Sequence, residues 1–436
     1  MRYAIVTFGC RVNQADSLAV EDELRARGAR STPAHEADIV IVNTCSVTAS
    51  ADQGARQAIR RIARDNPAAR VIVTGCYATR RPDEVTSLPN VLRIVTNEGK
   101  DALARELADA HLGRHGGDEG VAPTTAERFG AGDGACGEAL EPGVAGRTAL
   151  TLRVQTGCDE RCSYCIIPKT RGAGRSRPLA GVLADLRRAV RAGYKEIVIT
   201  GVHLGSYGRD LHDGTTLETL VRALAEWPDE VLFRVSSLEP MDCSDAIVDL
   251  VAESPRLAPH LHLPLQHGCD GILAEMGRPY TSAFYRRLVE RIRARVPEAA
   301  IGSDVIVGFP GEEAEHAQEL VSLLEALPLT HLHVFPYSDR PGTEASAMPR
   351  KVGGADIRAR AAAVRAAGQE LTRRFHASQV GAVRRALTVD DGSHVVTDNY
   401  LKLRIAPGRA RNEWVQVRIG GSPGALEASL TAARSG

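Results

Sequence analysis

The sequence lacks three features that would each point early to a class of protein. It has no net formal charge, with 54 Lys+Arg against 54 Asp+Glu, so composition gives no sign of a nucleic-acid partner. It has no hydrophobic run near the roughly 20 residues of a membrane-spanning helix. Its first residues, MRYAIVTFGC, lack the charged and apolar pattern of a signal peptide. We therefore expect a protein of the cytoplasm without membrane contact.

Charge is nevertheless distributed unevenly along the 436 residues. Residues 350–418 hold 14 Lys+Arg and 6 Asp+Glu, a net formal charge of +8, and the rest of the chain carries −8. A basic end on an acidic body favours an anionic partner at that end, although a solvated helical face would give the same count. A chain of this length should contain two or three domains.

Cysteine is the informative residue type, and the chain has nine. Tight clusters of cysteine are typical of metal binding in a reducing compartment rather than of disulfides. Residues 157–168 read GCDERCSYCIIP and place Cys158, Cys162 and Cys165 in a C-x3-C-x2-C array after the apolar run 149–156. Three thiolates at this spacing suit a 4Fe-4S cluster with one iron open to another ligand.

Two other interpretations of this array stay open. A structural zinc site would need a fourth Cys or His nearby, and none stands between the array and Arg171. Three unrelated buried thiols would need no metal at all. The iron–sulfur interpretation accounts best for the spacing.

Residues 1–112 predict a parallel, doubly wound α/β sheet. Short β-branched runs at 3–8, 39–43 and 71–74 alternate with helical patterns at 17–26 and 53–63. Cys10, Cys45 and Cys76 each follow one of these strands. Because the carboxyl ends of parallel strands share one edge, these thiols should meet there as a second three-cysteine site. Ordinary buried cysteines at strand ends are the alternative.

The first array stands in a longer motif that resembles a known family. CSYCIIPKTRGAGRSRP is similar to the cluster loop of the radical S-adenosylmethionine (SAM) enzymes, and within them of the methylthiotransferases. The proline and the Arg-Gly and Arg-Ser-Arg elements fall where that family has them, whereas Ala173 and Gly174 replace larger, charged residues. The resemblance implies that Cys158, Cys162 and Cys165 hold a 4Fe-4S cluster whose open iron chelates SAM.

The strand ends of the N-terminal region resemble the same family. TFGCRVNQ, NTCSVT and TGC are similar to the methylthiotransferase N-terminal domain, whose three cysteines hold an auxiliary 4Fe-4S cluster. This implies two 4Fe-4S clusters, with Cys10, Cys45 and Cys76 as ligands of the second. TFGCRVNQ looks most like the branch that acts on threonylcarbamoyladenosine in tRNA. The isopentenyladenosine and ribosomal-protein branches usually read differently after that cysteine.

Residues 113–146 are rich in Gly, Ala, Glu and Asp without periodicity and predict a flexible linker. Residues 147–378 hold six candidate strands, at 149–156, 196–200, 231–236, 260–265, 300–307 and 330–336, with helical stretches between them. Six strand–helix repeats predict a partial (β/α)6 barrel, and the resemblance implies that it is of the radical SAM type. Its chemistry should gather at the carboxyl ends of the strands, where the cluster cysteines stand.

Other strand ends of this barrel should line the same cavity. TGVHLGSYG, SSLEP, HLPLQHG and GSDVIVGFPGE each resemble a family segment, which implies contacts with SAM and substrate. Gly201 and Gly205 would let the backbone approach the methionine end of SAM. Each polar candidate is more often a structural residue, but four could orient the nucleoside: Ser236, Glu239, Gln266 and Asp304.

The remaining candidate ligands fit no metal site. We interpret three cysteines as incidental: Cys136, Cys243 and Cys269. Three histidines lack ligand spacing with respect to one another: His203, His262 and His267.

Residues 379–436 predict a small closed β-barrel of the oligonucleotide-binding type. Short alternating runs at 383–389, 394–397, 400–405 and 414–419 are separated by turn residues, and we expect about five short strands. TDNYLKLRI resembles the family's C-terminal TRAM module, which binds RNA or, in one branch, a ribosomal protein. Tyr400 or Trp414 could stack on a base, although core packing is the commoner role. Four cations could contact phosphates: Lys402, Arg404, Arg409 and Arg411.

These resemblances together imply a methylthiotransferase that acts on tRNA. It would add a methylthio group to carbon 2 of N6-threonylcarbamoyladenosine at position 37, in the anticodon loop. An electron from a donor such as flavodoxin or ferredoxin would cleave SAM to a 5′-deoxyadenosyl radical, which removes the hydrogen of that ring carbon. A methylated sulfur from the second cluster would follow, and two SAM molecules would be consumed per turnover. The oligomeric state is not implied.

Three alternatives stay open at this point. The same chemistry could act on isopentenyladenosine in tRNA or on an aspartate of a ribosomal protein. A radical SAM enzyme could insert sulfur elsewhere. A protein of another class, a non-catalytic, metal-stabilised RNA-binding protein, would produce no 5′-deoxyadenosine when incubated with dithionite and SAM.

Overall fold

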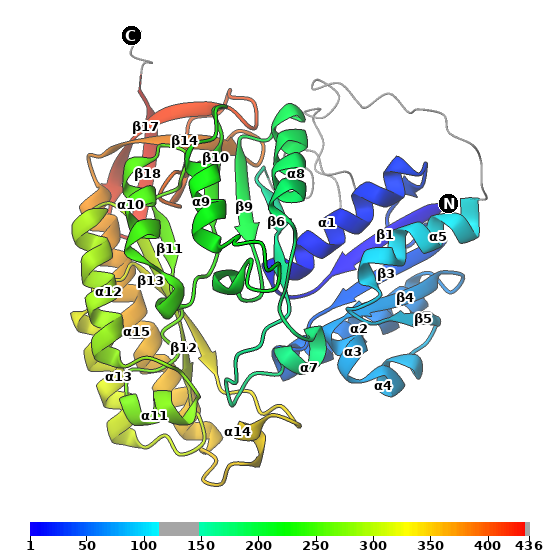
Figure 1. The fold of residues 1–436 in the computed structure, drawn as a ribbon, viewed down its shortest axis with the longest axis horizontal. Helices are drawn as coiled ribbons and strands as arrows, with labels where there is room; N and C mark the ends of the chain where they lie inside the picture. The colour runs from blue at the N-terminus through cyan, green and yellow to red at the C-terminus, as the bar shows by residue number, and fades with distance from the viewer. Residues whose placement is uncertain (113–147, 432–436) are drawn as a thin grey trace.

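The computed structural model describes residues 1–112 and 148–431. Its N-terminal part is built on a five-stranded parallel sheet of order β2-β1-β3-β4-β5 (Figure 1). The strands are β1 (Arg2–Thr7), β2 (Arg30–Ser31), β3 (Ile39–Thr44), β4 (Arg70–Gly75) and β5 (Val91–Val95). The central strand β3 is buried along its whole length, as expected for a strand that is covered on both faces.

Helices cover both faces of this sheet, which confirms the doubly wound fold predicted from the sequence. One face packs against α1 (Arg11–Ala26) and α5 (Leu103–Leu112), which follows the 3-10 turn η1 (Lys100–Ala102). The other face packs against α2 (Ala49–Asp65), α3 (Cys76–Arg80) and α4 (Pro82–Thr86). The edge strands β2 and β5 were not predicted.

A second set of parallel strands forms the central partial barrel. They are β6 (Leu150–Arg153), β9 (Glu196–Thr200), β10 (Leu232–Val235), β11 (His260–His262), β12 (Ala300–Val307) and β13 (His331–Pro336). β6, β9 and β10 form one ladder and β11, β12 and β13 another, and the Phe233–Leu257 bridge joins them. The six predicted strands are confirmed. The first of them breaks after Arg153, where β7 (Gln155–Thr156) turns to pair with β8 (Arg175–Ser176).

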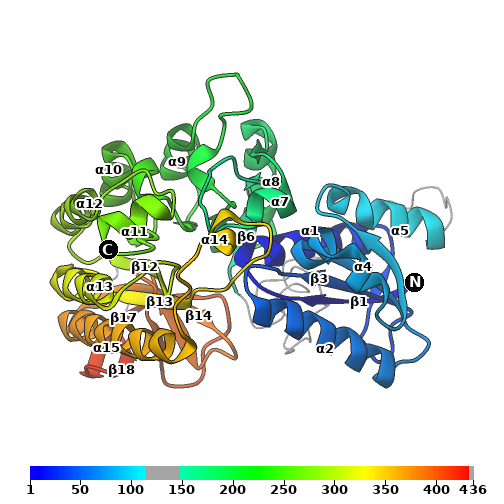
Figure 2. The same cartoon turned by 90° about the horizontal axis from the view of Figure 1, so that it is seen from below.

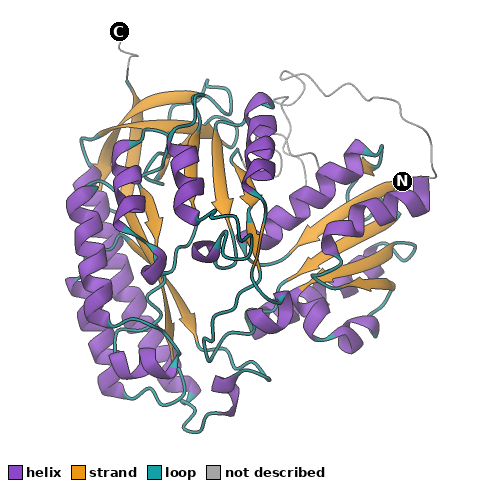
Figure 3. Cartoon of the chain, in the orientation of Figure 1, coloured by secondary structure: helices purple, strands orange, loops and turns teal. Residues whose placement is uncertain are grey.

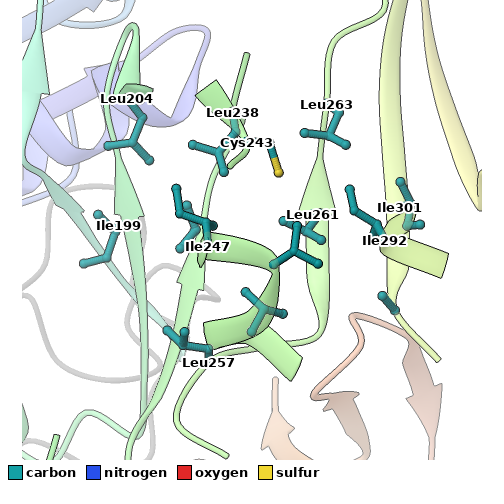
Figure 4. Packing of buried hydrophobic residues seen from close by; sticks show 14 of the residues in the cluster. Ile199, Leu204, Leu238, Cys243, Ile247, Leu257, Leu261, Leu263, Ile292 and Ile301 are labelled. Carbon is teal, nitrogen blue, oxygen red and sulfur yellow. The ribbon is translucent and has the colours of Figure 1, made fainter. Parts of the chain in front are cut away.

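Helices pack along the outer face of these strands (Figure 3). They are α8 (Leu179–Arg191), α9 (Leu217–Ala225), α10 (Asp245–Glu253), α12 (Ser282–Arg295), α13 (Ala314–Ala326) and α15 (Gly354–Gln379). The short helices α7 (Ile167–Arg171), α11 (Asp270–Glu275) and α14 (Glu344–Ala347) and the 3-10 turns η3 (Leu204–Ser206) and η4 (Pro240–Asp242) belong to the connections. Strand side chains such as Ile199 and Leu261 pack against helix side chains such as Ile247 (Figure 4). Cys243 lies in the same apolar cluster, so its thiol is a core group.

The C-terminal residues close into a five-stranded barrel of order β14-β15-β16-β18-β17, as predicted. Its strands are β14 (Val383–Val389), β15 (His394–Thr397), β16 (Lys402–Arg404), β17 (Trp414–Ser422) and β18 (Ala425–Leu430). Asn399 Nδ2 donates to the Glu298 carbonyl and Asn412 Nδ2 to the Gly193 carbonyl, which anchors this barrel to the central one. The N-terminal sheet stands beside the central barrel (Figure 2).

The predicted linker 113–146, with Cys136, lies outside the described residues, and the domain limits at 112, 146 and 378 stay predictions. Within residues 1–112 and 148–431, the structure contains no helix of the length and apolar character needed to cross a membrane.

Candidate active site

The three N-terminal cysteines meet at the carboxyl edge of the first sheet. Cys10 is the N-cap of α1, Cys45 follows β3 directly, and Cys76 is the first residue of α3. Gly9 has a φ of +94°, and a Cβ on it would lie 2.5 Å from the sulfur of Cys45. Only glycine therefore lets these two segments approach so closely. We call Cys10, Cys45 and Cys76 the N-terminal trio.

The electrostatics of the N-terminal trio show that its thiols are neighbours. Burial and the nearby Cys10 and Cys76 thiols together raise the pKa of the Cys45 thiol to about 11. Cys45 and Cys76 are buried, whereas Cys10 is exposed. Asn97 Nδ2 lies 3.6 Å from the Cys76 sulfur, to which it can donate a hydrogen bond. A thiol with a raised pKa binds a metal only when the metal displaces its proton.

We call Cys158, Cys162 and Cys165 the barrel trio. They lie on a loop after β7 that packs closely against neighbouring segments because glycine leaves room for it. Gly157 has a φ of +73°, and a Cβ there would clash with the Ala173 carbonyl oxygen at 1.9 Å. Cys158 N donates to the Gly172 carbonyl at 3.1 Å, and Ser163 N donates to the Met276 carbonyl at 3.0 Å. The loop that carries Cys158, Cys162 and Cys165 is thus fixed at both ends.

Proton donors surround the sulfurs of the barrel trio. Arg278 Nη1 donates to the Cys162 sulfur at 3.1 Å, and its Nη2 pairs with Glu239. His203 Nδ1 lies 3.9 Å from the Cys158 sulfur and its Nε2 lies 2.7 Å from Asp242. Burial alone would lower the pKa of His203, but Asp242 and the sulfur raise it to about 10. Such donors stabilise thiolates that ligate a metal.

The donor set fits an iron–sulfur cluster better than a single metal ion. A tetrahedral Zn–S distance of about 2.3 Å needs sulfurs within about 4 Å of one another. Across residues 1–112 and 148–431, neither cysteine trio brings three ligand atoms within 4.8 Å of one another. Cysteines that bind different irons of one cluster stand further apart, so neither trio is a preformed zinc site, and that both trios hold clusters stays a prediction.

A cavity of about 490 Å³ connects the N-terminal sheet with the mouth of the central barrel. Cys10 and Arg11 line one side of it, and Tyr400 of the C-terminal barrel closes another. The barrel contributes three of the residues proposed from the sequence: Gly201, Ser236 and Asp304. Cys10, the exposed cysteine of the N-terminal trio, therefore lines the same cavity as residues of the barrel strands, whereas the barrel trio does not line it.

The other three proposed residues lie outside this cavity lining. A Cβ on Gly205 would lie 2.1 Å from Asp242 Oδ2, so this glycine makes room for the carboxylate that supports His203. Glu239 pairs with Arg278. Gln266 has a φ of +68° and pairs through its backbone with β12. Contacts of all six residues with SAM or a nucleoside stay predictions.

The cavity also contains a cluster of histidines that was not predicted from the sequence. His262 Nε2 and His333 Nδ1 each lie 2.9 Å from Asp304 Oδ1, and the three residues could together hold a metal ion. Gly302, between them on β12, admits the rings, because a Cβ there would lie 2.2 Å from His331 Nε2. Burial alone would raise the pKa of Asp304, but the two histidines hold it well below its usual range.

A buried group of charges joins the N-terminal sheet to the barrel loop. Asp16 of α1 is fully buried and lies 2.9 Å from Lys100, 2.5 Å from Arg153 and 3.0 Å from Arg171. Arg171 belongs to α7, which follows the barrel trio directly. Asn97 donates to the Thr170 carbonyl at 2.7 Å. The two cysteine trios are therefore held in fixed relation.

Tyr400 joins all three parts of the protein. Arg11 Nη2 donates to its hydroxyl at 2.7 Å, and the Arg234 guanidinium lies 4.6 Å from its ring centroid. The ring of His260 lies 4.7 Å away. Tyr400 has a φ of +74°, which a non-glycine residue adopts only when its surroundings enforce it. Trp414, the other aromatic proposed for base stacking, instead packs against Arg385.

Comparison with known proteins defines the class of this protein. Residues 152–324 match the radical SAM superfamily, and residues 2–97 match the uncharacterized protein family UPF0004. The fold resembles that of TsrM from Kitasatospora setae, a radical SAM methyltransferase solved with cobalamin and a 4Fe-4S cluster, with a TM-score of 0.57 at 18% identity over 79% of this chain and 74% of that one. Fold and site therefore define a radical SAM enzyme, which implies SAM and a 4Fe-4S cluster as cofactors.

Relatives of known activity define the family. The chain is 34% identical to the threonylcarbamoyladenosine tRNA methylthiotransferase of Thermotoga maritima over 88% of this chain and 85% of that protein. It is 36% identical to the tRNA-2-methylthio-N(6)-dimethylallyladenosine synthase of Nitratidesulfovibrio vulgaris (80% and 78%) and 32% identical to the ribosomal protein uS12 methylthiotransferase of Desulfotalea psychrophila (93% and 90%). The chain belongs to the methylthiotransferase family of radical SAM enzymes.

Proposed function

We propose that the protein adds a methylthio group to carbon 2 of N6-threonylcarbamoyladenosine at position 37, in the anticodon loop of tRNA, with two SAM molecules consumed per turnover. The observation that carries this proposal is the cavity that Cys10 of the N-terminal trio lines together with residues of the barrel strands. Relatives from Thermotoga maritima, Aquifex aeolicus and Bacillus subtilis that match most of the chain act on this nucleoside by name. Because tRNA is its substrate, the enzyme would work in the cytoplasm.

In this proposal each cysteine trio holds one 4Fe-4S cluster. SAM with the barrel cluster supplies radical chemistry that can break a C–H bond which no acid or base can reach. The chain then has three tasks. Arg278 and His203 stabilise the thiolates of the barrel trio, the Asp16 charges hold the two trios in fixed relation, and the cavity walls orient the base between them.

The C-terminal barrel and an electron donor complete the proposal. Lys402 and Arg409 are each paired with an acidic residue at the barrel surface. Arg404 is exposed on β16 without an ion pair among the described residues, so it is the cation we expect to contact a tRNA phosphate first. A flavodoxin or ferredoxin would deliver the electrons.

Iron content tests the two-cluster part of the proposal. Anaerobically purified protein should contain about eight irons and about eight sulfides per chain. Replacing the three cysteines of either trio by alanine should leave about four. If the N-terminal replacement leaves the iron content unchanged, that trio holds no cluster.

Nucleoside analysis tests the substrate. Mass spectrometry of tRNA from a strain that lacks this protein should show loss of the methylthio form of threonylcarbamoyladenosine alone, restored by the wild-type chain. The relative that acts on dimethylallyladenosine at 36% identity supports the same chemistry on the isopentenyl nucleoside as a second candidate. Loss of that methylthio nucleoside instead would establish the second candidate.

A further inference from the structure

Arg11 is a cavity-lining arginine without a carboxylate partner. It follows Cys10 and begins α1. Its one hydrogen bond among the described residues goes to the neutral hydroxyl of Tyr400, and none of the ion pairs within residues 1–112 and 148–431 includes it. Two other guanidiniums near the trios are neutralised, Arg171 by Asp16 and Arg278 by Glu239.

The histidines add unused hydrogen-bonding capacity beside Arg11. His260 is 4% exposed and lines the cavity, and its Nδ1 is buried without a partner. The ring of Tyr400 lies within 4.7 Å of the His260 ring, while its hydroxyl accepts from Arg11, so one tyrosine brings both groups to the same wall. A guanidinium and a buried imidazole nitrogen without a partner, on the wall of one cavity, can together bind an anion.

Among the described residues that line the cavity, Arg11 is the only lysine or arginine and Asp304 is the only carboxylate. The Asp304 carboxylate is already engaged by His262 and His333. A carboxylate carried into the cavity by a substrate would therefore find an open, charge-complementary position at Arg11.

We propose that Arg11, with His260, binds the carboxylate of the threonylcarbamoyl substituent and thereby selects this nucleoside over one with a hydrocarbon substituent. This inference rests on the proposed function. Carbon 2 and carbon 6 of adenine flank the same ring nitrogen, so a base that presents carbon 2 to the N-terminal trio carries its N6 substituent close by. A residue that directly follows Cys10 is placed to reach that substituent.

A matched pair of RNA substrates tests the inference on the full-length, cluster-loaded protein. One anticodon stem-loop carries threonylcarbamoyladenosine, and the other carries its methyl ester, which removes the charge and adds one methyl group. Wild-type enzyme should show a kcat/KM about 10- to 100-fold higher for the acid, because hydrogen bonds to a charged group contribute that much. Binding of the two labelled RNAs, measured by fluorescence anisotropy, should differ in the same direction.

Variants assign the preference to Arg11. Arg11→Gln should lose most of the preference for the acid, whereas Arg11→Lys should retain part of it. Tyr400→Phe removes the hydrogen bond between the domains and leaves the guanidinium in place, so it should keep the preference. Arg25→Gln, an exposed arginine of the same helix, is the control. Iron content and SAM cleavage without RNA report whether each variant still carries its clusters.

Three results would overturn the inference. The first is a wild-type enzyme that modifies acid and ester equally, which needs no variant to interpret. The second is an Arg11→Gln enzyme that keeps the full acid preference. The third is an Arg11→Gln enzyme whose KM rises for SAM alone, because the subsite would then hold the SAM carboxylate. Modification of isopentenyladenosine only, with no activity on either substrate of the pair, would instead refute the proposed function and the inference with it.

Discussion

Asp16→Asn tests whether the buried charges between the N-terminal sheet and the barrel loop stabilise the protein. The Asp16 side chain is 0% exposed, and those of Lys100 and Arg171 are 2% exposed each. Asparagine keeps the shape of the side chain but removes the only carboxylate that these two buried cations contact in the described residues. Both cations would then remain out of water without an opposite charge.

The size of the effect follows from what each cation retains. Removing one partner of a buried ion pair costs about 3–5 kcal/mol. Lys100 keeps a hydrogen bond to Asn43 at 3.1 Å, and Arg171 keeps one to Asn13 at 2.5 Å. We therefore expect a loss near the lower limit, about 3 kcal/mol, which is a large share of the roughly 5–15 kcal/mol of a typical domain.

Urea unfolding of the variant, with hydrogen exchange to localise the loss to α1 and α7, measures this effect. Asp22→Asn is the control, an exposed aspartate on the same helix that should change stability by less than about 0.5 kcal/mol. A loss under about 1 kcal/mol at pH 7 for Asp16→Asn would refute the reasoning.

The pH dependence gives an independent check on Asp16. Burial alone would raise the pKa of Asp16, but Lys100, Arg171 and Arg153 lower it below its usual value. The stability that this carboxylate contributes is therefore fully present above the unfolded-state pKa of about 4 and is lost as the pH falls further. Wild type and variant should converge in stability in acid.

Three further predictions concern the candidate site. Gly9→Ala should displace the neighbouring thiol of the N-terminal trio and reduce iron from about eight to about four per chain, whereas Gly28→Ala, at a similar φ of +81° but in open space, should keep all of it. Arg278→Met should lower cluster retention or activity about 10- to 100-fold, measured by iron release to a chelator, and unchanged retention and activity would contradict its role. The hydrogen bond to Asp304 raises the pKa of His333, so an NMR titration of the Asp304→Asn variant should show a lower value, and an unchanged one would argue against that bond.

The fold could be predicted where burial imposes a pattern on the sequence. Strands such as β3 and β12 are almost wholly buried, so they appear as β-branched runs with helical patterns between them. The edge strand β5 shows no such pattern, because only its last residue is buried and Leu92 is 57% exposed. β2 has two residues, too few for any periodicity to emerge.

The barrel trio could be proposed from its close spacing along the chain, and the N-terminal trio could be proposed because each of its cysteines follows a predicted strand. The histidine cluster could not be predicted in either way, because Asp304 and His333 lie inside their strands and far apart in the sequence. Their meeting depends on strand register: β12 pairs Gly302 with His262 on one side and with His331 on the other. The rings fit only because Gly302 has no side chain, and no local sequence pattern predicts this.

The position of Tyr400 has a consequence for the evolution of this architecture. Its ring is a shared wall between the C-terminal barrel, which we propose to bind RNA, and the cavity where the base would react, and Arg11 from the opposite end of the chain donates to its hydroxyl. The C-terminal barrel is therefore not a binding domain that could be exchanged without changing the cavity. Replacing this barrel by that of a relative with another target would change both the cavity lining and the proposed nucleic-acid-binding surface. Affinity for a new partner and chemistry on that partner would therefore have to change together.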